Sequence, residues 1–259
     1  MNDANDTGAR YAAPALEKGL DLLEALSEQP GGVAQEALAQ RVGRTVAEIF
    51  RMLSVLERRG YVARDPLTTQ YGLTLKLFEL ANRHPPTRRL QQAALPVMQA
   101  LAEQVGQTCH LVVVHGEQIL VVAEERPSLP MAFGVRLGAA FPFVSRYVSA
   151  RVLAAFQPPP RRAELAGRMA AAEALDRADL LEARLARIAA AGHDVAPSEV
   201  HDGVIDISYP IVDARGIAVA ALTVPLLPPR GAAPDRAAVE AALEAAARRI
   251  SEAIGGSLP

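Results

Sequence analysis

The chain has 259 residues, of which half are hydrophobic and 22% are charged, with a formal net charge of −2 and one cysteine. This composition excludes a disordered chain, which would lack core-forming residues, and a disulfide scaffold, which would need several cysteines. No apolar run reaches the roughly 18 residues of a membrane helix, and the first ten residues are polar, so we expect a cytoplasmic protein without a signal peptide.

A cluster of positive charge lies between residues 41 and 64, although the chain as a whole is near neutral. This segment contains six arginines and two glutamates, which gives it a net charge of +4. A basic segment in a near-neutral chain indicates that one local surface binds an anionic partner. It does not indicate a wholly basic protein that binds nucleic acid over its entire surface.

The first third of the chain has the residue order of a winged helix-turn-helix. Leucines at three- and four-residue spacing predict a first helix, which ends before the glycine pair at 31–32. Thr45 is a natural N-cap for the third helix, and Glu48 lies at the spacing of a capping box. In this fold the second helix of the helix-turn-helix pair enters the DNA major groove. We expect helices over 14–28, 35–42 and about 45–59, and strands over 61–64 and 71–74.

The rest of the chain predicts an antiparallel sheet with helices packed on it. A helix is expected over 75–83, and the prolines within 84–87 interrupt the helical pattern, so we place a domain boundary there. Strand pairs joined by hairpins, with helices grouped between and after them, favour the α+β class. We expect strands over 110–115, 119–124, 131–135, 203–212 and 216–226, and helices over 88–105, 145–156, 161–172, 176–191 and 234–254.

The third helix has an apolar face and a mainly cationic face. Ile49, Leu53 and Leu56 fall on one side, and the opposite side carries arginines, whose planar guanidinium can bind guanine or phosphate. A solvated helix face explains the same pattern, and Glu48 either caps the helix or reads a cytosine amine. The expected DNA-binding residues, including two threonines in the wing, are Gln35, Arg44, Thr45, Glu48, Arg51, Arg58, Thr68 and Thr69.

Seven segments occur in an order that is characteristic as a set: ALEKGLDLL (15–23), LSVLERRGYV (53–62), QYGL (70–73), GQTCHL (106–111), DGV (202–204), ISYPI (207–211) and AALTV (220–224). With these segments the chain, over roughly residues 12–255, resembles the IclR family of bacterial transcription regulators. The resemblance implies a winged helix that binds palindromic promoter DNA, a linker helix used in dimerisation, and a GAF-like effector domain. It also implies homodimers or homotetramers that control genes for catabolism of small organic, often aromatic, acids.

On this resemblance we expect three parts in the chain: a DNA-binding domain over 12–74, a linker helix over 75–87, and an effector-binding and oligomerisation domain over 88–256. Three segments depart from the family pattern. Residues 46–48 are Val-Ala-Glu where Lys-Ser-Thr is frequent, residues 205–206 are Ile-Asp in place of Arg-Cys, and the loop at 144–150 is VSRYVSA. The base readout and the ligand therefore need not follow the family.

Matching the chain to the family by position places a mostly apolar effector pocket in the second domain. Arg146 would bind an effector carboxylate, pair with Asp206, or lie exposed. If Arg146 and Asp206 pair, a cationic or neutral ligand fits better than an acid. The aromatic residues would sandwich a ring or belong to the core. The expected effector-binding residues are Phe133, Val135, Phe143, Ser145, Arg146, Tyr147, Asp206, Ser208 and Thr223.

Catalytic and metal chemistry have little support in the sequence. Cys109 and His110 are adjacent on an expected strand, so their side chains point to opposite faces and cannot form a dyad. The five histidines lack metal-ligand spacing, and dinucleotide, phosphate-loop and hydrolase motifs are absent. We therefore expect no enzyme, no cofactor and no metal, and Cys109 is expected to be a buried structural thiol.

Two functional interpretations remain from the sequence. The favoured one is a ligand-responsive regulator, a repressor by family habit, that binds an inverted-repeat operator and a small organic or aromatic acid. The alternative is a GAF-type small-molecule-binding or enzymatic module whose N-terminal domain contacts proteins. Strong salt dependence of DNA binding would favour the first.

Overall fold

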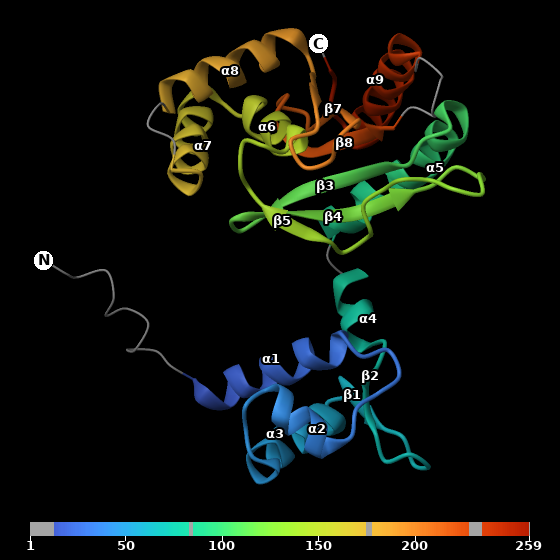
Figure 1. The fold of residues 1–259 in the computed structure, drawn as a ribbon, viewed down its shortest axis with the longest axis vertical. Coiled ribbons are helices and arrows are strands. Elements are labelled where there is room, and N and C mark those ends of the chain that lie inside the picture. The colour runs from blue at the N-terminus through green and yellow to red at the C-terminus, as the bar shows by residue number, and fades with distance from the viewer. Residues whose placement is uncertain (1–12, 83–84, 175–177, 228–234, 259) are drawn as a thin grey trace, which may run out of the picture. The chain divides into compact units, whose positions relative to one another are not determined.

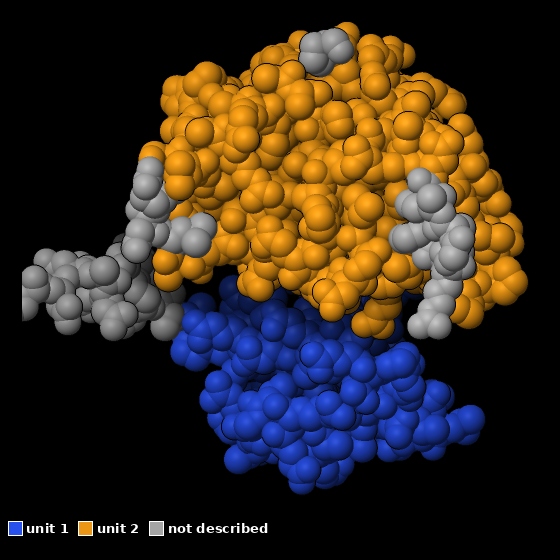
Figure 2. All heavy atoms as spheres, turned by 45° about the horizontal axis from the view of Figure 1, so that its top comes forward, with its two compact units in different colours: residues 1–84 blue, residues 85–259 orange. Residues whose placement is uncertain are grey.

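The structure, a computed structural model, describes residues 13–82, 85–174, 178–227 and 235–258. The chain divides into two compact units, residues 1–84 and residues 85–259, which Figure 2 shows in blue and orange. Each unit has its own hydrophobic core.

The N-terminal unit is a winged helix-turn-helix, as the sequence predicts. Leucines of the first helix pack with Ile49 and Leu53 of the third and with Val62 and Tyr71 of the hairpin, and all four of these residues are buried. The two hairpin strands pair antiparallel (Figure 1). The elements are α1 (Pro14–Ser27), α2 (Gln35–Arg41), α3 (Val46–Arg58), β1 (Val62–Arg64), β2 (Tyr71–Leu73) and α4 (Lys76–Asn82).

The C-terminal unit is built on one six-stranded antiparallel sheet, which confirms the predicted fold class. The strand order is β5-β4-β3-β8-β7-β6, so the two hairpins β3–β4 and β7–β8 meet at the sheet centre. The strands are β3 (Cys109–His115), β4 (Gln118–Glu125), β5 (Ala140–Pro142), β6 (Asp194–Pro197), β7 (Ile205–Val212) and β8 (Ala218–Leu226).

Helices cover both faces of this sheet and form two separate cores. Helices α5 (Pro85–Val105) and α9 (Arg236–Ala253) pack on one face, where Leu111, Leu222 and Leu243 are fully buried. On the other face α6 (Val148–Ala155) lies between the sheet and the outer helices α7 (Pro159–Ala172) and α8 (Ala178–Ala191). Every residue of α6 is buried as a result.

Three expectations about the elements were wrong. Residues 131–135 form no strand, and the segment approaches Thr108 so closely that a Cβ on Gly134 would lie 2.5 Å from its methyl carbon. The short edge strands β5 and β6 were not expected. Helix α5 begins at Pro85 and not at residue 88, since proline is tolerated in the first helical turn.

A buried ion pair joins α6 to the edge of the sheet. The Arg151 Nε atom lies 2.6 Å from Oδ2 of Asp194 on β6, and Nη1 donates to the carbonyl oxygen of Ser145 at 2.6 Å. The Arg151 side chain is 1% exposed, and the nearby Glu199 carboxylate lies 3.9 Å away. One guanidinium therefore ties together a helix, a strand and the loop that precedes the helix.

Asp194→Ala should destabilise the C-terminal unit by about 3–5 kcal/mol, because it leaves a buried guanidinium without its carboxylate. Urea denaturation measures this change. The control is Glu199→Ala, which removes a half-exposed carboxylate from the same arginine and should cost no more than about 1 kcal/mol. Equal losses in the two variants would contradict the assignment of the stability to the buried pair.

Candidate DNA interface and ligand pocket

The outer face of α3 carries three arginines that are free to meet a partner. Arg44, which precedes the helix, and Arg51 and Arg58 within it are all exposed. Across the described parts of the chain, none of the three has an ion-pair partner. The expected cationic face is thus present, and its charge is not compensated by a neighbouring carboxylate.

Glu48 caps α3 and is neutralised by a lysine. Its Oε2 accepts hydrogen bonds from the Thr45 backbone N–H at 3.0 Å and from the Thr45 hydroxyl at 2.9 Å, while Oε1 lies 3.0 Å from Lys18 Nζ on α1. The Thr45 backbone N–H, followed by Lys18, lowers the pKa of Glu48 to about 2. Of the two expected roles for Glu48, the geometry supports capping.

The remaining expected DNA-binding residues shape the approach to α3 and the tip of the wing. Gln35 Nε2 donates to the Val46 carbonyl at 3.4 Å, across the helix-turn-helix. In the wing, the Thr68 backbone N–H donates to Asp65, and Thr69 has a φ of 58° with its carbonyl accepting from Arg64. Both threonines are exposed at the tip.

Helix projection from the sequence places Val55 beside the arginines, but it does not indicate the further exposed apolar side chains of α3. Phe50 is 55% exposed on α3, and Val46 and Val55 are also exposed. Exposed apolar side chains of this kind can contact thymine methyl groups in a major groove. The sequence feature that could have predicted this exposure is the position of Phe50, which is next to Arg51 and outside the apolar face that packs into the core.

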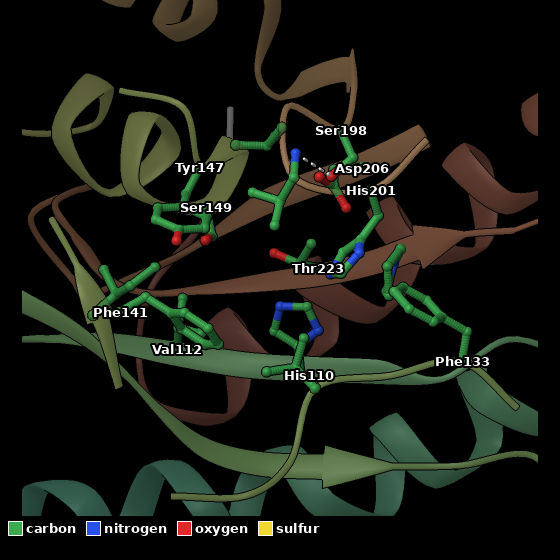
Figure 3. A pocket seen from close by; sticks show the side chains of 15 residues that line it. His110, Val112, Phe133, Phe141, Tyr147, Ser149, Ser198, His201, Asp206 and Thr223 are labelled. Atoms are coloured by element: carbon green, nitrogen blue, oxygen red, sulfur yellow. Dashed lines mark hydrogen bonds between the residues drawn. The ribbon is translucent and has the colours of Figure 1, made fainter. Parts of the chain in front are cut away.

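A pocket that is partly open to solvent lies on the α6 face of the C-terminal sheet. Figure 3 shows side chains from the sheet, from α6 and from the loop before β7 pointing into it. Most of its wall is apolar, with a few polar groups, as is usual for small-molecule sites. Five of the nine expected residues line it: Phe133, Val135, Tyr147, Asp206 and Thr223.

The other four expected residues do not line this pocket. Phe143 is buried in the core beneath α6, and the Ser145 backbone N–H donates to Glu173. Arg146 is exposed with its guanidinium 5.7 Å from the Tyr147 ring centroid, because the loop before α6 directs it outward. Among the described residues, no ion pair joins Arg146 to Asp206. Ser208 is buried against Thr223, with 2.8 Å between their hydroxyl oxygens.

A row of buried polar side chains crosses the sheet beneath the pocket. Strand register places His110 opposite Thr223, Thr223 opposite Ser208, and Ser208 opposite Asp194, so all four project from the α6 face. Asp194 ends the row at its ion pair with Arg151. The pairing register of strands that are distant in the sequence brings these side chains into one row, and their spacing along the sequence does not predict it.

His110 and three other polar lining residues were missed by sequence reasoning. His110 is 7% exposed and its Nδ1 has no hydrogen-bond partner in the described structure. Burial lowers its pKa to about 4, so the ring is neutral at neutral pH. Ser149, Ser198 and His201 also line the pocket. The alternation of side chains along a strand places His110 and Cys109 on opposite faces of the sheet, and this was the sequence signal that could have indicated His110 as a lining residue.

Cys109 faces the opposite side of the sheet and is unsuited to nucleophilic chemistry. Its Sγ atom lies 3.4 Å from the Met98 carbonyl oxygen, and burial raises its pKa to about 12. A thiol held protonated in an apolar core is inert. The expectation of a buried structural cysteine is confirmed.

Asp206 is the carboxylate of the pocket. Burial raises its pKa, while a hydrogen bond from the Ser198 side chain and the charges of Arg151 and His201 oppose that shift.

Within the described ranges, no group of three or more His, Cys, Asp or Glu residues is placed to hold a metal ion. Nor does any described helix combine the length and apolar character that a membrane span requires.

Two family models match the chain. Residues 87–252 match the bacterial transcriptional regulator IclR C-terminal domain, and residues 15–66 match the IclR helix-turn-helix domain.

Relatives and solved structures agree with these matches. The regulator KdgR of Escherichia coli is 26% identical over 242 residues, which cover 92% of this chain and 91% of KdgR. The acetate operon repressor of Salmonella typhimurium is 25% identical over 49% of this chain and 47% of its own length. An IclR homologue from Microbacterium hydrocarbonoxydans, complexed with 4-hydroxybenzoate, has the same fold, with a TM-score of 0.75, 21% identity, and coverage of 93% and 98% of the two chains.

The neutral state of buried His110 should make stability depend on pH. The unfolded chain takes up a proton near the ordinary pKa of 6.5, whereas the folded protein does so near 4, so acid favours unfolding across this window. The free energy of unfolding should fall by about 2–3 kcal/mol between about pH 7 and pH 4.5 through this group.

His110→Asn should remove that part of the pH dependence, as measured by urea denaturation at the two pH values. The exposed His115 at the end of the same strand supplies the control, because His115→Asn should keep the wild-type profile. An unchanged profile in His110→Asn would show that His110 is not buried in its neutral form.

Proposed function

The chain belongs to the IclR family of bacterial transcriptional regulators, and we propose that it is a repressor that binds an inverted-repeat operator and responds to a small organic ligand. Its helix-turn-helix is a DNA-binding domain, and the matched family consists of regulators and not of enzymes.

The observation that carries the DNA-binding proposal is the uncompensated cationic face of α3. Arg51 and Arg58 are exposed and without ion pairs among the described residues, whereas Glu48 on the same helix is held by Thr45 and Lys18. A carboxylate that is already paired repels DNA phosphate less than a free one does. The face is therefore suited to guanine edges and to phosphate.

Operator symmetry follows from an assembly that we propose to be a dimer or a dimer of dimers. Two copies related by a two-fold axis would place their α3 helices in major grooves about 34–36 Å apart, one helical turn of DNA. An operator read in this way is an inverted repeat. The name of one relative, the acetate operon repressor, supports repression as the sign of regulation.

The ligand response is assigned to the pocket on the α6 face of the sheet. An IclR homologue with this fold is complexed with 4-hydroxybenzoate, which supports a small molecule with a ring as the class of ligand. The expectation of an acidic effector came from the family resemblance, with Arg146 as one possible partner for its carboxylate, and Arg146 lies outside the pocket lining. For regulation, the ligand must bind the DNA-bound and the free protein with different affinities.

Arg51→Ala should weaken binding to DNA from upstream of the protein's own gene by ~1–3 kcal/mol and relax specificity if Arg51 reads a base. If Arg51 touches only phosphate, the loss should be the same on shuffled DNA. Fluorescence anisotropy at two salt concentrations measures both cases. Arg248→Ala, on an exposed face of α9, is the matched control and should leave binding unchanged. Equal binding by wild type and Arg51→Ala would contradict the role given to α3.

A further inference from the structure

We propose that the pocket selects a cation, an ammonium or amidinium group carried on an apolar, ring-sized body, and this inference rests on the proposed function of the pocket as the ligand site. Of the 15 residues that line it, Asp206 is the one carboxylate, and no lysine or arginine is among them. A ligand carboxylate would therefore meet a like charge, while a ligand cation would meet an opposite one.

The cations near Asp206 are already committed to other carboxylates. Arg151 is bound to Asp194 at 2.6 Å and lies 3.9 Å from Glu199. Arg184 interacts with the same two carboxylates from α8. Arg151 and Arg184 are thus engaged by Asp194 and Glu199, whereas Asp206, at the pocket surface, has no ion-pair partner among the described residues.

The rest of the wall fits the body of such a ligand. The rings of Phe133, Phe141 and Tyr147 and the aliphatic side chains of Val112 and Ile119 supply an apolar surface (Figure 3). Aromatic faces also attract cations.

Beside this surface, the neutral His110 ring has a buried Nδ1 without a partner in the described structure. A neutral imidazole offers one acceptor nitrogen, which a ligand N–H group would satisfy. The side chains of Asp206 and His110 come from β7 and β3, and the Thr223 side chain from β8 lies between them in Figure 3. A cation with several N–H groups can therefore bind more than one wall of the pocket.

Three probes of similar size test the charge of the ligand: benzylamine, benzyl alcohol and benzoate. Isothermal titration calorimetry with the full chain at neutral pH should give benzylamine at least about tenfold tighter than benzyl alcohol, with benzoate weakest. Asp206→Asn should remove the preference for benzylamine and leave benzyl alcohol unchanged. Asp202→Asn, which changes an exposed carboxylate in the turn before β7, should behave as wild type.

A second readout is the pH dependence of benzylamine binding. Benzylamine stays protonated between about pH 7.5 and pH 5.5, so its own charge does not change in this range. If acidification weakens benzylamine binding to wild type but not to Asp206→Asn, the lost affinity is due to protonation of Asp206. His201 and Arg151 also face Asp206, and both are present in wild type and in Asp206→Asn. The difference between the two proteins therefore isolates the carboxylate.

The inference is overturned if benzoate or benzyl alcohol binds wild type as tightly as benzylamine, if benzylamine does not bind, or if Asp206→Asn binds benzylamine like wild type. DNA binding by the same protein samples is measured separately by anisotropy. Benzylamine binding without DNA binding would contradict the proposed function and leave the pocket assignment intact. DNA binding without benzylamine binding would overturn the inference alone.

Discussion

The C-terminal unit depends on one buried ion pair, Arg151 with Asp194. A charged side chain that is 1% exposed in a fully buried helix is costly unless it is paired, and here Asp194 and the Ser145 carbonyl accept from Nε and Nη1 of Arg151. The pair fixes α6 against β6, and β6 aligns with β7 so that Ala196 lies opposite Asp206. The pair therefore holds the loop before α6, through Ser145, and the strand that lies beside the pocket carboxylate.

The two functional surfaces treat their carboxylates in opposite ways. On α3, Glu48 accepts hydrogen bonds from Thr45 and pairs with Lys18, so the surrounding arginines keep an uncompensated positive charge for an anionic partner. In the pocket, the neighbouring guanidiniums are bound by Asp194 and Glu199, so Asp206 keeps a negative charge for a cationic partner. In both places the local pairing decides which charge is left to meet a ligand.

The sequence predicted the helices, the wing and the two long hairpins, because their periodicity and capping signals are local. Thr45 and Glu48 stand at capping-box spacing, and the structure contains that capping box. The edge strands β5 and β6 could not be predicted, since three or four residues carry little periodicity and pair only when the sheet exists. The pocket was predicted in part: Asp206 and Thr223 line it, whereas Arg146 points away and His110 enters through cross-strand register.

The measurement that tests the account most directly is the affinity of benzylamine for the free protein and for the protein bound to operator DNA. If the pocket controls DNA binding, the two affinities differ, and operator affinity with and without saturating benzylamine differs by the same factor. That reciprocal change is the predicted result. Measurable binding of benzylamine with the same affinity in both states would contradict the account, because the pocket would then be a ligand site without influence on DNA.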